Sequence, residues 1–170
     1  MQFQLGEQER KDAKRPHEIF LINLITNHIL LFVALLGLAR SNPEVMLLTP
    51  VISMFFLGYL LWRANHSRGR DHWFAQSHWM ICARRSKIFI AMLLLMALLV
   101  TLLLFMVNFD AAALKPGHYA LGGVAILPTM ITVLVLVIME SDAMHQASEG
   151  RVAAWAATSV GVPAGITPLS

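Results

Sequence analysis

Four polar side chains interrupt an apolar stretch near the start of the chain, and they are the first that could carry out chemistry. They are Asn23, Thr26, Asn27 and His28. At about 100° per helical residue, Asn23 and Asn27 share one face, while His28 points about 100° further round. Because polar side chains within apolar helices commonly hydrogen-bond to neighbouring helices, we interpret the group as a contact with other helices or with a partner protein.

His28 is also the single histidine near the middle of a long apolar stretch. A haem held by two histidines in a helical bundle needs a second histidine at the same depth on another helix. The other apolar stretches contain none at that depth. We therefore expect no haem held by this chain alone. An axial ligand or a quinone contact shared with a partner is the alternative role for His28.

Further histidines lie among carboxylates in the more polar segments, and these residues are the candidates for a metal site. The histidines are His66, His72, His78 and His145, and the carboxylates are Asp71, Glu140, Asp142 and Glu149. His72 and His78 are six residues apart, about 240° round a helix, so they do not share a face. The one cysteine, Cys82, has no second cysteine with which to form a thiolate cluster. We expect no metal and no other cofactor.

Signatures of catalysis and of coupled transport are also missing from the sequence. It contains no GxSxG, no HExxH and no phosphate-binding lysine loop. The apolar stretches contain no Asp, Glu, Lys or Arg between their ends, whereas ion-coupled transporters usually use a buried carboxylate or broken helices. We expect a protein that is not an enzyme.

The composition indicates the class of protein that carries these residues. Of the 170 residues, 57% are hydrophobic and 14% are charged, and the mean hydropathy is +0.63. These values do not fit a soluble or a disordered chain. About 20 apolar residues cross a bilayer as a helix, and stretches of about this length cover 20–39, 45–62, 88–109 and 119–139. We predict an all-α membrane protein with four transmembrane helices, a segment 1–19 before them and a tail 140–170 after them.

The distribution of Lys and Arg predicts how these helices are oriented. Eleven of the positive residues fall before the first span, between the second and third, or after the fourth, and two, Arg40 and Lys115, fall in the other connections. Because positive residues are enriched on the cytoplasmic side, we predict that both termini and residues 63–87 are cytoplasmic, in a bacterial inner membrane. The same bias accounts for the net charge of +3, so we expect no nucleic-acid partner.

The connections predict how the four helices are grouped. Residues 40–44 form a short turn that contains Pro43, and residues 110–118 form another that contains Pro116 and Gly117. Short connections make consecutive helices antiparallel neighbours, so we predict two antiparallel hairpins. The tail should be irregular after about Val160, and 152–162 is too short for a fifth span.

Residues 63–87 join the two hairpins and mix aromatic with basic side chains. One interpretation is an amphipathic helix that lies among the lipid head groups, and the other is the cytoplasmic start of a long third helix. On the first interpretation, the residues that contact anionic phospholipids or the interface are Arg63, Arg68, Arg70, Trp73, Trp79, Arg84, Arg85 and Lys87.

These patterns favour a non-catalytic role. We expect an accessory subunit that stabilises a larger complex through contacts with other integral membrane subunits, with anionic phospholipids and at a cytoplasmic docking surface. An electron-transfer subunit that contacts haem or quinone through His28 is one alternative. A small homo-oligomeric channel or carrier is the other.

Overall fold

We describe a computed structural model that covers residues 1–39, 41–110, 113, 115–164, 166 and 168–169. Four helices are long and apolar enough to cross a membrane, Glu7–Ala39, Glu44–His66, Trp73–Phe105 and Pro116–Ser148. The described residues contain isolated β-bridges but no strand. The prediction of an all-helical chain with four helices long and apolar enough to cross a membrane is confirmed.

The first long helix changes its winding where its polar residues lie. It consists of α1 (Glu7–Ile22), the π-helical segment η1 (Asn23–Leu31) and α2 (Phe32–Ala39). Its start is capped by the Glu9 carboxylate, which accepts a hydrogen bond of 2.9 Å from the Gly6 amide. A π-helix has more residues per turn than an α-helix and often marks a functional position. Here it brings Asn23, Asn27 and His28 into the interior together.

The second long helix consists of a 3₁₀ turn, η2 (Pro43–Leu47), and α3 (Leu48–His66). The third, α4, begins at Trp73 and runs to Phe105. The connection between these two long helices is much shorter than the predicted one. Residues 73–87 are therefore the first turns of α4, as in the second interpretation of this segment, and the head-group helix is not formed. Burial explains the difference, because the aromatic side chains of these turns are covered by protein.

The fourth long helix passes its predicted end at residue 139. Helix α5 spans Pro116–Ser148, with proline at its first position, where the missing amide proton has no consequence. It continues into the predicted tail because Glu140, Ala143 and Ala147 lie on one buried face. A short helix, α6 (Ala154–Val160), follows.

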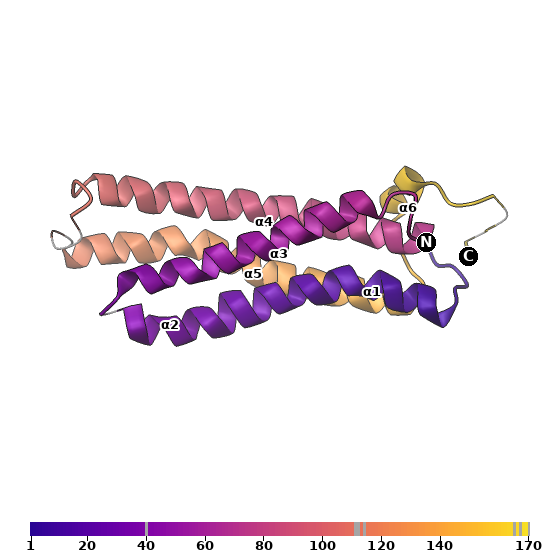
Figure 1. The fold of residues 1–170 in the computed structure, drawn as a ribbon, viewed down its shortest axis with the longest axis horizontal. Helices are drawn as coiled ribbons and strands as arrows, with labels where there is room; N and C mark the ends of the chain where they lie inside the picture. The colour runs from indigo at the N-terminus through magenta and orange to yellow at the C-terminus, as the bar shows by residue number, and fades with distance from the viewer. Residues whose placement is uncertain (40, 111–112, 114, 165, 167, 170) are drawn as a thin grey trace.

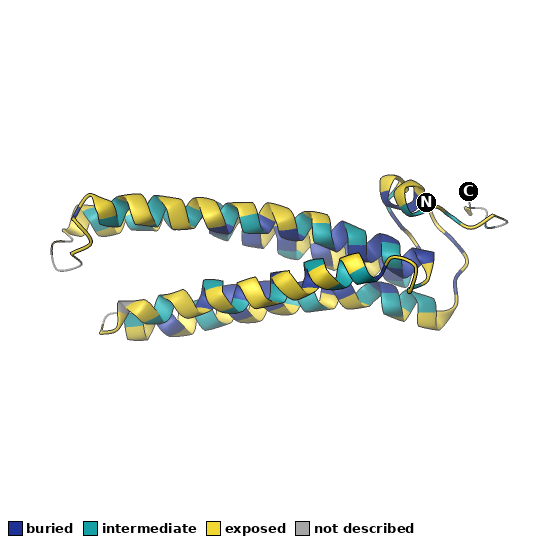
Figure 2. Cartoon of the chain, turned by 45° about the horizontal axis from the view of Figure 1, so that its top comes forward, coloured by how far each residue is buried: buried dark blue, intermediate teal, exposed yellow. Residues whose placement is uncertain are grey.

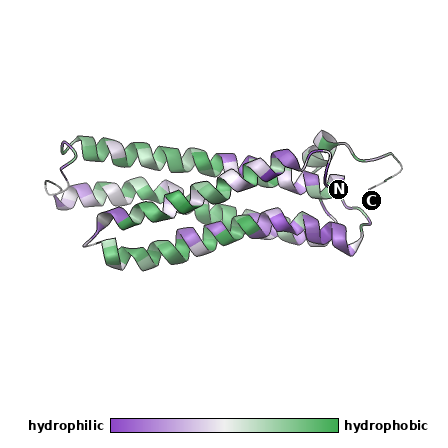
Figure 3. Cartoon of the chain, in the orientation of Figure 1, coloured by the Kyte–Doolittle hydropathy of each residue, from purple (hydrophilic) through white to green (hydrophobic). Residues whose placement is uncertain are grey.

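Both chain ends lie at one end of the elongated bundle (Figure 1). Gln2 forms β-bridges with Arg151 and with Leu169. Gly150 permits this arrangement, because its φ is +71° and an added Cβ atom would lie 2.5 Å from the Phe3 carbonyl oxygen. We call this end, formed by residues 1–17, 63–87 and 140–164, the polar end, since hydrophilic side chains gather there (Figure 3).

Burial is concentrated toward the polar end, and the helices spread apart toward the opposite end (Figure 2). One apolar cluster covers the polar end itself and includes Phe3, Trp73 and Val152. A second lies deeper between the helices and includes Phe20, Leu57, Phe89 and Val133. At the polar end, α1, α4 and α5 therefore pack against one another.

Candidate functional site

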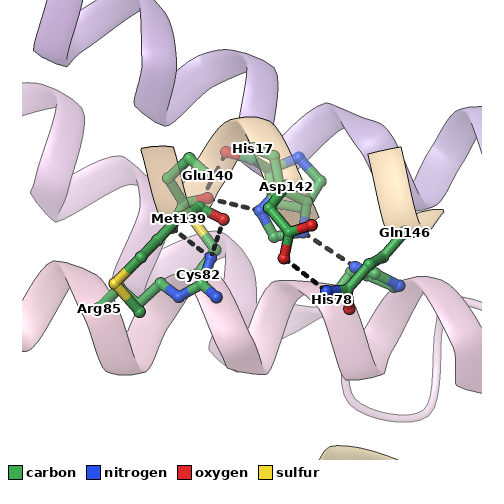
Figure 4. Close-up of polar contacts among 9 residues, drawn as sticks. His17, His78, Cys82, Arg85, Met139, Glu140, Asp142 and Gln146 are labelled. Atoms are coloured by element: carbon green, nitrogen blue, oxygen red, sulfur yellow. Dashed lines mark hydrogen bonds and ion pairs between the residues drawn. The ribbon is translucent and has the colours of Figure 1, made fainter. Parts of the chain in front are cut away.

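A group of ionisable side chains is buried where α1, α4 and α5 meet. Figure 4 shows His17, His78, Cys82, Arg85 and Glu140, which we call the His17 cluster. His17 lies on α1 and Glu140 on α5, and the other three lie on α4 at spacings of four and three residues, which place them on one helix face. All except Arg85 have no exposed surface.

The Glu140 carboxylate is bonded through both of its oxygens. Oε2 lies 2.5 Å from His17 Nδ1, and Oε1 accepts a hydrogen bond of 3.1 Å from Arg85 Nη1. The same Arg85 nitrogen also donates to the Met139 carbonyl at 2.9 Å. A buried carboxylate requires such partners, because its removal from water is costly. The carboxylate thus ties α1 and α4 to α5.

The two histidines extend this contact toward the surface as a chain of hydrogen bonds. His17 Nε2 lies 2.9 Å from His78 Nδ1, and His78 Nε2 donates to the Arg151 carbonyl at 3.2 Å. The two rings meet edge to face, with an interplanar angle of 87°. The chain therefore runs from Glu140 through both imidazoles to the backbone that follows α5.

The three hydrogen bonds of this chain need one proton more than two neutral imidazoles supply. The contacts Glu140–His17, His17–His78 and His78–Arg151 need one proton each. A carboxylate and a carbonyl supply none, and each neutral imidazole supplies one. Two protons cannot complete three hydrogen bonds, and an incomplete one would place two lone pairs face to face in the interior. The cluster consequently needs a third proton, or a metal ion in place of a proton.

Cys82 adds a sulfur ligand beside this pair. Its thiol donates to the Pro16 carbonyl at 3.4 Å. A nitrogen of His17, the Cys82 sulfur and a Glu140 oxygen all lie within 4.8 Å of one another. The site thus offers one nitrogen, one sulfur and one oxygen ligand from three different helices, in the interior of the protein.

The asparagines predicted from the sequence face the interior of the bundle. Asn23 donates to the Ser53 hydroxyl at 3.0 Å, and Asn27 donates to the Thr49 carbonyl at 2.9 Å. Both acceptors lie on α3. Thr26, which was grouped with them, is instead exposed on the outside of the helix. The buried face of the π-helical segment includes Asn23, Asn27 and His28, and Thr26 lies on the other side.

His28 points toward a different helix from the asparagines. Its ring lies edge to face with Phe89 of α4, with ring centroids 4.8 Å apart. The ring is buried, and Nε2 has no hydrogen-bond partner among the described residues. The His17 cluster and His28 are thus separate features of the first long helix.

The predicted lipid-contact residues divide into two groups. Trp73 and Trp79 are only 6% and 4% exposed, so their prediction as interface residues is wrong. Trp73 packs on Phe3, and Trp79 lies under the Arg63 guanidinium group. Arg85 belongs to the His17 cluster, and Arg63 forms an ion pair of 2.8 Å with Asp71. The exposed members are Arg68, Arg70, Arg84 and Lys87.

Sequence reasoning missed His17, and it named Glu140 only as one of several carboxylates in a candidate metal site that it did not favour. His17 falls in the predicted segment 1–19 and Glu140 in the predicted tail, so neither was assigned to a span. One signal was present, because Glu140, Ala143 and Ala147 follow a helical spacing that continues the fourth span. Comparison of the chain with protein-family models, curated proteins and solved structures gave no match.

Proposed function

We propose that this protein is a non-catalytic accessory subunit of a larger complex in the bacterial inner membrane. In this role it stabilises the complex through helix packing, lipid contacts and a cytoplasmic docking surface. The observation that carries the proposal is the contrast between the two ends of the bundle. The polar end is closed by internal contacts, whereas the helices of the opposite end spread apart (Figure 2).

Large apolar side chains are exposed in the spread part of the bundle. There, α2 packs against η2, and α4 packs against α5. Phe55 on α3 is 76% exposed and Leu94 on α4 is 62% exposed. In a bilayer such surfaces are covered by lipid or by helices of another protein. Helices of a partner subunit would pack against these exposed faces.

The proposed orientation places the two antiparallel hairpins with the polar end in the cytoplasm. A hollow of about 420 Å³ opens at this end, and its lining includes Arg68, Arg84, Lys87 and Trp155. Arg84 lies over the Trp155 ring, 5.0 Å from its centroid. Three cations beside an indole suit an anionic phospholipid head group or an acidic segment of a partner. This hollow is the proposed docking surface.

Photo-crosslinking in cells tests the proposal. A photoreactive amino acid at Leu94 should give one discrete product that contains a different membrane polypeptide. The matched control is the neighbouring position Leu93, which is buried in the bundle and should give no such product. Deleting the chain should also reduce the amount of the partner's complex on a native gel.

Two outcomes would contradict the accessory role. Products that contain only further copies of this chain would favour the homo-oligomeric channel or carrier. The other outcome is that Leu94 crosslinks to lipid alone and that deleting this chain changes the amount of no membrane complex on the native gel. The protein would then have no partner subunit to stabilise.

One observation favours a second candidate, an electron-transfer subunit that contacts haem or quinone through His28. A buried nitrogen without a hydrogen bond costs about 1–3 kcal/mol, and a ligand on Nε2 would remove that cost. An optical spectrum of the purified complex tests this candidate. A Soret band that co-purifies with this polypeptide and disappears in His28→Ala would favour the electron-transfer role. A spectrum that is the same in the wild type and in His28→Ala would contradict it.

A further inference from the structure

We propose that His17, Cys82 and Glu140 form a binding site for a divalent transition-metal ion of the zinc class. The site is independent of the accessory role. It would fasten α1, α4 and α5 together at the polar end.

The three ligand atoms already lie close together. They lie within 4.8 Å of one another, and all three side chains are buried. Zinc bonds of about 2.0–2.3 Å in a tetrahedral arrangement separate neighbouring ligand atoms by roughly 3.3–3.8 Å. The His17–Glu140 contact of 2.5 Å must therefore open by about 1 Å, and the sulfur must move inward by a similar amount.

The proton count marks where the ion would sit. Between His17 Nδ1 and Glu140 Oε2 the hydrogen-bonded chain requires a positive charge that neither neutral imidazole supplies. A metal ion bound to both atoms meets this requirement. It leaves His17 Nε2–H to donate to His78 Nδ1 and His78 Nε2–H to donate to the Arg151 carbonyl. Every hydrogen bond of the chain is then complete.

The groups behind the ligands resemble the outer shell of known metal sites. A metal-bound histidine usually donates its other ring N–H to an acceptor that fixes the orientation of the ring. His78 is such an acceptor and is itself held by a backbone carbonyl. Metal-bound carboxylates are also hydrogen-bonded, and Arg85 supplies that bond to Glu140.

The exchange of protons for metal balances in charge. Zn²⁺ would displace the proton shared by His17 and Glu140 and the proton of the Cys82 thiol, and both protons would pass to solvent. Two positive charges leave and two enter, so the net charge of the buried cluster is unchanged. Mixed nitrogen, sulfur and oxygen ligands suit zinc and neighbouring transition metals, and they do not suit Mg²⁺ or Ca²⁺.

Cobalt titration of the full-length protein in detergent tests the proposal. Cobalt occupies zinc sites, and a cobalt–thiolate bond gives a near-ultraviolet charge-transfer band. Because Cys82 is the only cysteine, that band reports on this site alone. We expect one Co²⁺ per chain in the metal-stripped protein, displaced by Zn²⁺, and co-purifying zinc in untreated protein.

Variants separate metal ligands from neighbouring residues. Cys82→Ser should remove the charge-transfer band, and Glu140→Gln should abolish tight binding while retaining the hydrogen bonds of the cluster. His78→Ala, which removes a group behind a ligand, should weaken binding about 10–100-fold. The matched control is His28→Ala, a buried histidine on the same long helix, which should bind cobalt normally.

Two results would overturn the proposal. One is a folded wild-type protein, judged by circular dichroism, that gives no thiolate band at saturating Co²⁺ and contains no zinc. The cluster would then hold a third proton only. The other is a band that persists in Glu140→Gln with unchanged affinity, since the carboxylate would then not be a ligand.

Discussion

Replacing Glu140 by leucine or by glutamine should have very different effects on stability. Leucine removes both acceptors and leaves Arg85 and His17 without their buried partner. Removing one member of a buried ion pair typically costs about 3–5 kcal/mol. We therefore expect Glu140→Leu to lower the free energy of unfolding by about that amount.

Glutamine should be tolerated far better because its amide completes the same chain. Its Nε2–H can donate to His17 Nδ1, and its oxygen can accept from Arg85. With this donor the three hydrogen bonds of the chain have three protons without an extra cation. The remaining loss is the strengthening that the charge gives to two hydrogen bonds, about 1–2 kcal/mol in total.

Steric trapping or reversible unfolding in mixed micelles measures both free energies. The matched control is Glu149→Gln, because Glu149 pairs with Arg151 and His145 at the exposed surface. Exposed ion pairs contribute about 0–1 kcal/mol, so this variant should remain close to wild type. If Glu140→Leu proves as stable as Glu140→Gln, the carboxylate does not hold the polar end together and the proton count has no energetic importance.

Three further predictions concern other parts of the molecule. Replacing Asn23 and Asn27 together by leucine should lower thermal stability in micelles by the loss of two interhelical hydrogen bonds, about 0.6 kcal/mol each, and unchanged melting would show that these bonds contribute nothing. Gly150→Ala should cost about 1–3 kcal/mol and detach the segment around Phe3, detected as faster proteolysis of the N-terminus, and undiminished protection would contradict the close contact. Reporters inserted near Gly69 and fused at the C-terminus should both report cytoplasm, and a periplasmic signal from either would overturn the proposed orientation.

The long apolar helices could be predicted from the sequence because each is set by local composition. Twenty apolar residues form a helix wherever the chain crosses a bilayer, so hydropathy alone located all four. Helix ends were less predictable. Helix α5 reaches Ser148 because its last turns are buried by α1 and α4, and that burial is a property of the assembled bundle.

The candidate site was beyond sequence reasoning for a related reason. His17 and Glu140 are 123 residues apart, and their meeting depends on the rotation of α1 relative to α5. The position of Cys82 beside this pair follows from the same packing, so its isolation in the sequence gave no indication of possible ligands nearby.

The distance between His17 and Glu140 along the chain also determines the order in which the parts of this site are synthesised. His17 leaves the ribosome early, whereas Glu140 and the Arg151 carbonyl emerge only after the fourth long helix has been synthesised. Until then, His17 and Arg85 lack the Glu140 carboxylate to which they bond in the complete structure. The last of these hydrogen bonds to form are those that depend on the fourth long helix and on the Arg151 carbonyl after it. Closure of the polar end therefore requires that all four long helices have been made.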